Sequence, residues 1–340
     1  MIPALLHHSL AQGGVFSTSQ ALKAGYTRDE IRGFIGKRRE WVRVRRGVFA
    51  TAETAEAWSL AERQMASDRA ASLNMTTAHL LSHDSAARLL GLPLVSTKDS
   101  LIHITRPGVE GTRTDCGVRH HLGKMPPGAM SVGAFRTTDL ARTALDIGRE
   151  HGLVAGVCAA DQVLRRGVGG QAFLRELDLM GHWPHIKRAR QAISMADPGA
   201  DSPAESLARL CLLGLDRGQV RTQFPFPMGD GRRSAWADLV LGPLVVEVDG
   251  RVKYDEGEPG ALWQEKLRQH AIERQPVLVE RVVWEEVLPR SWSKTMNRLA
   301  AAYERAVSRF GPGLPPEIES RAAKLAAERH RRIFGSVLAS

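Results

Sequence analysis

The segment ADLVLGPLVVEVDG (237–250) constrains the fold most, because it predicts a tight apolar hairpin that also contains three carboxylates. A two-residue turn at Gly242–Pro243 would place Asp238 directly opposite Glu247. Side chains alternate across a strand, so Asp249 is expected on the same face as Glu247. The opposite face is apolar and is predicted to line a core; its members are Leu239, Leu241, Val246 and Val248.

Opposed carboxylates destabilise a sheet, because their Cβ atoms lie about 5 Å apart across the two strands. A divalent cation removes that repulsion, and hard cations such as Mg²⁺ bind carboxylate oxygens together with water. Asp238 and Glu247 are therefore predicted to be metal ligands. Two alternatives stay open: the acids form a solvated face without a ligand, or a longer turn removes their direct opposition.

The segments around this hairpin predict an α/β unit of helix, three strands, helix and strand. The first helix is expected to begin at Ser202, with Pro203 in its first turn and Glu205 at the third helical position, as in a capping box. Glu205 is therefore a candidate for the acidic site and equally for a helix cap. The other expected elements are strands at 220–226 and 277–284 and a helix at 262–274.

This order of elements and acids resembles the PD-(D/E)XK nuclease superfamily, most closely its very-short-patch-repair-like branch. The resemblance covers about 200–290. A helix glutamate of the family matches Glu205, and a strand aspartate matches Asp238. The strand motif that follows matches VVEVDG (245–250), and the acid-x-x-Arg helix matches EKLR (265–268).

The resemblance implies a nuclease centre that depends on Mg²⁺. Asp238 and Glu247 would hold the ion, which activates a water and offsets the charge of the phosphate under attack. Arg268 or Lys266 would stabilise that phosphate.

Three positions depart from the family pattern. Asp249 stands where the superfamily has a lysine, and Glu265 stands where aspartate is usual. Related domains carry a histidine after Asp-Gly, where this chain has RVK (251–253). Lys253 offers a positive charge there, but no proton transfer at neutral pH unless its pKa is depressed. These departures favour inheritance of the fold over inheritance of the activity.

The first sixty residues predict a winged helix-turn-helix. A short helix is expected from the hydroxyl residues at 17–19 to Gly25. Thr27 and Glu30 have capping-box spacing for a second helix. Residues 41–49 then predict two short strands joined by a turn.

Basic side chains dominate the second helix and the ribbon, with eight bases against three acids over 28–46. Such a surface suits the major groove and the flanking phosphates of DNA. The alternative is a winged helix that contacts protein. The predicted DNA-binding residues are Arg28, Arg32, Lys37, Arg38, Arg39, Arg43, Arg45 and Arg46.

This N-terminal order (13–49) resembles the AbiEi-like antitoxins of type IV toxin–antitoxin systems, with one extra residue in KRREW (37–41). Two later motifs extend the likeness: SHDSAA (82–87) and ARTALD (141–146). The resemblance covers residue 13 to about residue 195. It implies a DNA-binding autorepressor module.

The histidines in the middle of the chain do not predict a catalytic or metal site. His120 and His121 point to opposite faces of a strand, so they cannot both serve one site. His83 lies where a helix begins, and capping or packing explains it. Arg142 and Asp146 have the i,i+4 spacing of a structural ion pair.

The overall charge favours a polyanionic partner. Lys and Arg number 47 against 37 Asp and Glu, a formal net charge of +10, although a generically basic surface is the alternative. Three scattered cysteines offer no disulfide framework, which suits a reducing cytoplasm. The N-terminus lacks the pattern of a signal peptide, and no apolar run is long enough to span a membrane.

The sequence therefore predicts an α/β multidomain protein of the cytoplasm that binds DNA. The expected function is a transcriptional regulator or antitoxin-like protein whose C-terminal domain keeps a nuclease fold. One alternative is an active Mg²⁺-dependent DNA endonuclease in defence or repair, and another is an interaction protein that neutralises a cognate toxin. The expected parts are a winged helix at 1–60, an antitoxin-like domain at 70–195, a restriction-endonuclease-like domain at 200–290 and helices at 291–340.

Overall fold

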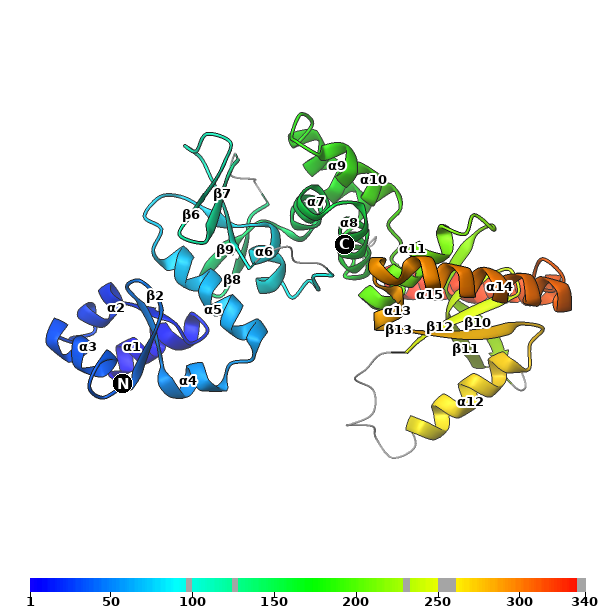
Figure 1. Ribbon diagram of the computed structural model, residues 1–340, viewed down its shortest axis with the longest axis horizontal. Coiled ribbons are helices and arrows are strands. Elements are labelled where there is room, and N and C mark those ends of the chain that lie inside the picture. Colours follow the sequence, from blue (N-terminus) through cyan, green and yellow to red (C-terminus); the bar gives the residue numbers. More distant parts are fainter. Residues whose placement is uncertain (96–99, 124–127, 229–232, 250–260, 335–340) are drawn as a thin grey trace. The chain divides into compact units, whose positions relative to one another are not determined.

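The computed structural model describes residues 1–95, 100–123, 128–228, 233–249 and 261–334. These residues form a mixed α/β protein with three sheets (Figure 1). The chain divides into two compact units. The first unit is Met1–Ala159 with Gly170–Ser194, and the second is Ala160–Gly169 with Met195–Ser340.

The first unit begins with three helices and a small antiparallel sheet of order β1-β3-β2. Ser17 caps α2 and Thr27 caps α3, each in a capping box, which confirms the prediction made for Thr27 and Glu30. The rings of Phe34 and Trp41 stack with centroids 4.8 Å apart in the core of this part. Its elements are α1 (Pro3–Ala11), β1 (Phe16–Ser17), α2 (Thr18–Lys23), α3 (Arg28–Ile35), β2 (Trp41–Arg45) and β3 (Val48–Thr51).

A six-stranded mixed sheet of order β6-β7-β5-β4-β9-β8 forms the rest of the first unit, together with its helices. Its strands are β4 (Leu80–Leu81), β5 (Ile102–Arg106), β6 (Thr112–Asp115), β7 (Val118–Leu122), β8 (Met130–Val132) and β9 (Phe135–Thr137). Its helices are α4 (Ala52–Ala57), α5 (Leu60–Leu73), α6 (His83–Leu89), α7 (Leu140–His151), α9 (Gly170–Leu179) and α10 (Ile186–Ser194). Helix α8 (Leu153–Arg165) runs from the first unit into the second.

The predicted ion pair on α7 is confirmed. Arg142 Nε donates to Asp146 Oδ2 at 2.9 Å, and both side chains are buried. The guanidinium also lies over the ring of Trp183, with its carbon 4.4 Å from the ring centroid. A buried arginine needs such partners, because an unpaired buried charge is strongly destabilising.

The second unit is built on a four-stranded sheet of order β10-β11-β12-β13, in which only the last pair is parallel. Its strands are β10 (Val220–Met228), β11 (Arg233–Leu241), β12 (Leu244–Asp249) and β13 (Leu278–Val283). Its helices are α11 (Pro203–Leu213), α12 (Ala261–Glu273), α13 (Trp284–Val287), α14 (Trp292–Phe310) and α15 (Pro316–Phe334), with a 3₁₀ turn at Pro289–Ser291. This confirms the predicted order of helix, three strands, helix and strand.

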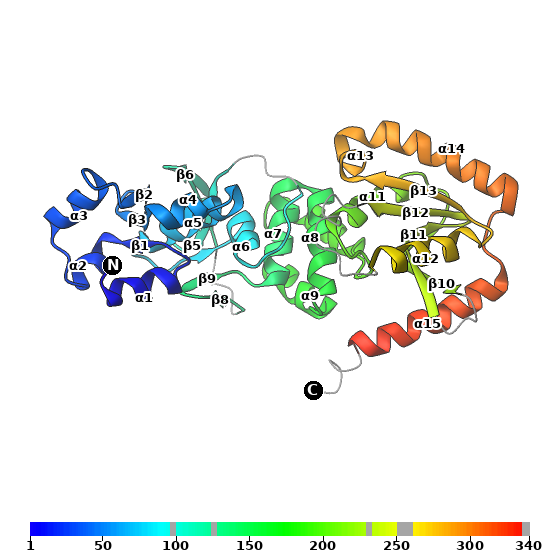
Figure 2. The ribbon, with the colours of Figure 1, turned by 90° about the horizontal axis from the view of Figure 1, so that it is seen from below.

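The predicted hairpin register is also confirmed. Leu241 pairs with Leu244 and Leu239 pairs with Val246, as a two-residue turn requires. Helices α11 and α14 lie on one face of the sheet, and α12 and α15 lie on the other (Figure 2). Both faces are therefore covered, and the face that holds the acids also contains the buried Val240 and Val245.

Candidate functional site

Three carboxylates from separate elements meet in the second unit: Glu205 at the start of α11, Asp238 in β11 and Glu247 in β12. We call them the carboxylate cluster. A glutamine of β10 joins two of them, since Gln223 Nε2 donates to Glu205 Oε2 at 3.2 Å and to Asp238 Oδ1 at 3.5 Å. The structure therefore brings both predicted metal ligands and the predicted helix glutamate together.

Asp238 lies one residue beyond the last ladder pair between β11 and β12. Its Oδ2 accepts a hydrogen bond from the backbone N–H of Val248 at 2.8 Å. Burial, followed by the charges of Glu247 and Glu205, raises the pKa of Asp238 to about 7. The cluster therefore holds a proton near neutral pH, in a place where a cation would offset the same charge.

Glu247 is the most buried member of the cluster, with 5% of its surface exposed. Its Oε2 accepts a hydrogen bond from Arg268 Nη2 at 2.5 Å. Its Oε1 is also buried and has no hydrogen-bond partner among the described residues. A buried carboxylate oxygen without a partner is costly, and such atoms occur where an ion or water binds.

The predicted capping box is formed only in part: Ser202 is the N-cap of α11 and accepts the Glu205 N–H, whereas the Glu205 carboxylate binds the Asp201 N–H instead of the Ser202 N–H. Glu205 Oε1 accepts from Ser202 Oγ at 2.9 Å, and its backbone N–H donates to the same oxygen of Ser202 at 3.2 Å. Its Oε2 takes the backbone N–H of Asp201 at 2.8 Å, and burial raises the pKa of its carboxyl. The Glu205 side chain thus binds the residues just before α11 and borders Asp238.

Arg268 is not a free cation, as its predicted role on a phosphate would require. It donates from Nη1 to the carbonyl of Trp236 at 2.6 Å and from Nε to Glu265 Oε2 at 2.9 Å, besides its bond to Glu247. Glu265 is exposed and is the partner of Arg268 rather than a member of the cluster. Arg268 therefore fixes Glu247 from α12.

The remaining predicted site residues lie apart from the cluster or outside the described part of the chain. Asp249 is exposed at the end of β12, where its carboxylate makes no hydrogen bond or ion pair with another described residue. Lys266 is exposed on α12. Lys253 lies outside the described residues.

Gln223 is the site residue that sequence reasoning missed. The antiparallel register places it opposite Asp238, because Thr222 pairs with Leu239 and Phe224 pairs with Ala237. That pairing was the one available signal, and it requires the register between β10 and β11, which the predicted strand at 220–226 and the hairpin at 236–249 do not define by themselves.

A second group of titratable side chains lies in the first unit, where His83, His103 and His121 are buried. The nitrogens that they would offer to a metal lie within 4.8 Å of one another. The rings of His83 and His121 stack with centroids 3.8 Å apart and planes at 15°. An imidazole lone pair lies in the plane of its ring, so two stacked rings cannot both bind one ion. In this conformation the three rings are a packed cluster.

The predicted divergence of His120 and His121 agrees with this arrangement. His121 faces the cluster, and its Nε2 lies 3.0 Å from Nδ1 of His103. Burial and the neighbouring His103 lower the pKa of His121 to about 3, so its ring is neutral. His120 instead accepts a hydrogen bond from Arg106 Nε at 3.2 Å.

The predicted DNA-binding residues differ in whether their charged groups already have a partner within the chain. Arg45 Nη2 donates to the carbonyl of Cys116 at 2.6 Å, so this guanidinium is engaged within the first unit. Arg32 is ion-paired with Asp29 and remains largely exposed. Arg38 lies over the ring of Phe34 at 4.9 Å. In the described part of the chain no ion pair involves the five exposed residues Arg28, Lys37, Arg39, Arg43 and Arg46.

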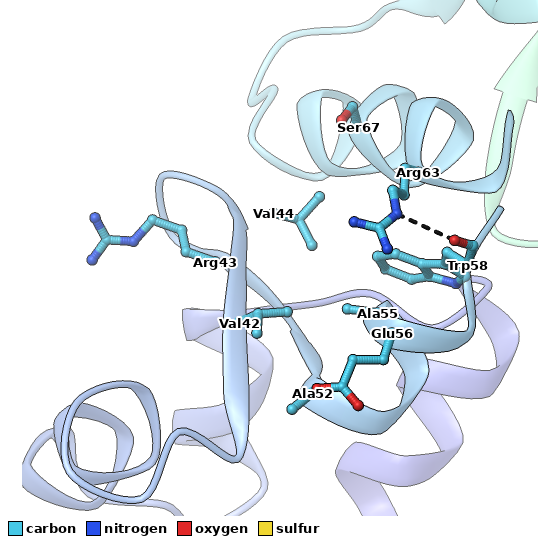
Figure 3. A pocket seen from close by; sticks show the side chains of 9 residues that line it. All are labelled: Val42, Arg43, Val44, Ala52, Ala55, Glu56, Trp58, Arg63 and Ser67. Carbon is cyan, nitrogen blue, oxygen red and sulfur yellow. Dashed lines mark hydrogen bonds between the residues drawn. The ribbon is translucent and has the colours of Figure 1, made fainter. Parts of the chain in front are cut away.

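A cavity of about 350 Å³ lies between β2, α4 and α5. Val44 and Val42 face it from the strand, whereas Arg43 points away from it (Figure 3). On the other side, Arg63 Nε donates to the carbonyl of Trp58 at 3.2 Å. No member of the carboxylate cluster lines this cavity. The Arg43 side chain extends outward from the ribbon in Figure 3.

The chain matches no model of a protein family and no curated protein. Among the described residues, no helix combines the length and the apolar character needed to cross a membrane. Function therefore has to be inferred from the arrangement of the side chains themselves.

Proposed function

We propose that this chain is a DNA-binding protein whose second unit hydrolyses phosphodiester bonds with a divalent cation such as Mg²⁺. One observation carries the proposal: Glu247 keeps a buried oxygen without a partner beside Asp238, whose pKa two neighbouring carboxylates and burial raise to about 7. Carboxylate oxygens that converge in this way are the ligands that hard cations prefer.

Asp238 and Glu247 would hold the ion, with Glu205 beside them. When bound, Mg²⁺ supplies Lewis-acid activation of water and offsets charge on the phosphate. The chain's own residues set the ligands in place. The Val248 N–H orients Asp238, and Arg268 fixes one oxygen of Glu247 while the other stays free of described partners.

The arrangement of the second unit supports a restriction-endonuclease-like fold of the PD-(D/E)XK type. Helix α11, the strands β10 to β12, helix α12 and β13 follow the order expected for that fold. The three acids fall on α11, β11 and β12, as in that superfamily's motif. Asp249 in place of the usual lysine is the departure that the proposal has to accommodate.

The N-terminal part is the proposed DNA-binding module, a winged helix-turn-helix. Its support is the order of α1, β1, α2, α3, β2 and β3, with a sheet of order β1-β3-β2. The exposed bases of α3 and β2 and of the loops beside them would contact phosphates and release counterions.

A second candidate is a transcriptional regulator or antitoxin-like protein that binds DNA without cutting it. The specific observation in its favour is that Arg268 already neutralises one oxygen of Glu247, while position 249 carries an acid instead of lysine. A charge so compensated needs less help from a cation.

Cleavage assays separate the two candidates. Plasmid and single-stranded DNA are incubated with the wild type, with Asp238→Asn/Glu247→Gln and with Glu273→Gln, an exposed acid of α12 that serves as control. The nuclease proposal expects nicking that needs Mg²⁺ or Mn²⁺, persists in the control and is lost in the double variant. Retained duplex binding without cleavage by any of the three would select the regulator.

A further inference from the structure

Gln223 has a backbone conformation that is unusual for a residue within a strand. Its φ is +46°, in the left-handed region that residues with a Cβ atom avoid. The ladder between β10 and β11 keeps one register on both sides of it, from Thr222–Leu239 to Phe224–Ala237. The strain is thus confined to the residue opposite Asp238, and such strain persists where the surrounding structure enforces it.

This conformation directs the Gln223 amide at two carboxylates. Its Nε2 lies 3.2 Å from Glu205 Oε2 and 3.5 Å from Asp238 Oδ1. Three other described donors each serve one of these acids: Ser202 Oγ and the Asp201 N–H bond to Glu205, and the Val248 N–H bonds to Asp238. The amide therefore links the start of α11 to the middle of β11.

The chemistry of the donor matters as much as its place. Two buried carboxylates repel each other, and the repulsion would drive their side chains apart. A lysine or arginine at position 223 would hold them together but would also neutralise them, which removes the electrostatic reason for binding a cation. A neutral amide donates hydrogen bonds and leaves the negative charge in place.

We propose that Gln223 is a positioning residue of the divalent-cation site: it holds the Glu205 and Asp238 carboxylates side by side and preserves their charge for the ion. This inference rests on the cation site of the proposed function. Gln223 acts through its two neighbours and is not a catalytic residue.

Mn²⁺ titration calorimetry on the full chain tests the proposal. The variants are Gln223→Ala, Gln223→Gly and Gln275→Ala, a glutamine that donates to the Ala271 carbonyl on α12 and serves as control. Loss of a group that orients metal ligands weakens metal binding about 10–100-fold. Both variants at position 223 are expected to show that loss, and the control is expected to bind Mn²⁺ as the wild type does.

A merely structural role would give a different result in thermal unfolding. Glycine adopts positive φ without strain, whereas alanine does not. Gln223→Gly is therefore expected to unfold at a higher temperature than Gln223→Ala, although both bind Mn²⁺ equally weakly. Mn²⁺ affinity that followed thermal stability across the two variants would overturn the positioning role.

The two proposals fail in distinguishable ways. If the wild type binds Mn²⁺ and Gln223→Ala binds it as tightly, this inference fails alone. If the wild type binds no Mn²⁺, the proposed function fails and takes the inference with it.

Discussion

Asp238 Oδ2 accepts a hydrogen bond from the backbone N–H of Val248 at 2.8 Å. A side chain of β11 thus bonds to the backbone of β12 just beyond the last ladder pair of the two strands. This bond fixes the carboxylate next to Glu247, which comes one residue earlier in the chain than Val248. The sheet itself thus sets two acids side by side, and their repulsion is the physical basis of the proposed cation site.

The stability of the cation-free chain should fall as pH rises. Burial and then the charges of Glu247 and Glu205 raise the pKa of Asp238 to about 7 in the folded state, against about 3.9 for an unperturbed aspartate. The folded chain therefore binds the extra proton between these values. Its free energy of unfolding should drop by on the order of 3 kcal/mol from pH 4 to pH 7.

Urea unfolding in EDTA across this pH range measures the effect for the wild type and Asp238→Asn. The variant has no proton to lose and should show a flatter profile. Identical profiles for the two proteins would show that Asp238 titrates normally.

Glu205→Gln should separate the hydrogen bonds that Glu205 makes at the start of α11 from the negative charge that it adds to the carboxylate cluster. The amide oxygen can still accept a hydrogen bond from Ser202 or Asp201, while one negative charge beside Asp238 disappears. We expect α11 to be retained, the free energy of unfolding to rise by about 1 kcal/mol at pH 8, and Mn²⁺ affinity to fall. Circular dichroism and calorimetry measure these quantities, and unchanged Mn²⁺ affinity would leave Glu205 only its contacts with Ser202 and Asp201 before α11.

Arg268→Ala should destabilise the second unit. The change removes the guanidinium that binds Glu247 Oε2 and leaves a buried carboxylate without a partner of opposite charge. We expect the free energy of unfolding to fall by about 3 kcal/mol. Arg274→Ala is the control, because Arg274 is exposed and follows directly after α12. Equal midpoints of urea unfolding for the two variants would mean that the pair contributes nothing.

The two arginines of β2 should differ in their effect on DNA binding. Arg43 is exposed and points outward, so Arg43→Ala should weaken duplex binding and lower the slope of log K against log salt by about 0.9. Arg45 is held by the Cys116 carbonyl, so Arg45→Ala should change that slope little. Fluorescence anisotropy from 50 to 300 mM salt, a range chosen to resolve the slope, measures both. Equal slopes for the two variants would remove the distinction.

The hairpin of the second unit could be predicted because its information is local. A short turn fixes the register, and alternation then places Asp238 and Glu247 on one face. The N-cap of α11 at Ser202 is local in the same sense, since Ser202 lies three residues before Glu205, whose N–H it accepts. Such features follow from a few neighbouring residues and need no knowledge of the rest of the fold.

The remaining geometry depends on distant contacts. Arg268 reaches Glu247 across 21 positions of the sequence, and no spacing rule shows that it will bind Glu247 and the Trp236 carbonyl. The positive φ of Gln223 likewise has no sequence signature, because glutamine does not favour it. Helix α5 is different, because the three-residue spacing of Ser59 and Glu62 is itself the local signature of the capping box that begins it.

Crystals soaked in Mn²⁺ test the central claim most directly, through an anomalous difference map. The account predicts a peak in contact with Asp238 and with the Oε1 atom of Glu247, and no such peak in Asp238→Asn/Glu247→Gln crystals. A map from the wild type with no peak at these carboxylates, or with Mn²⁺ bound only elsewhere, would contradict it.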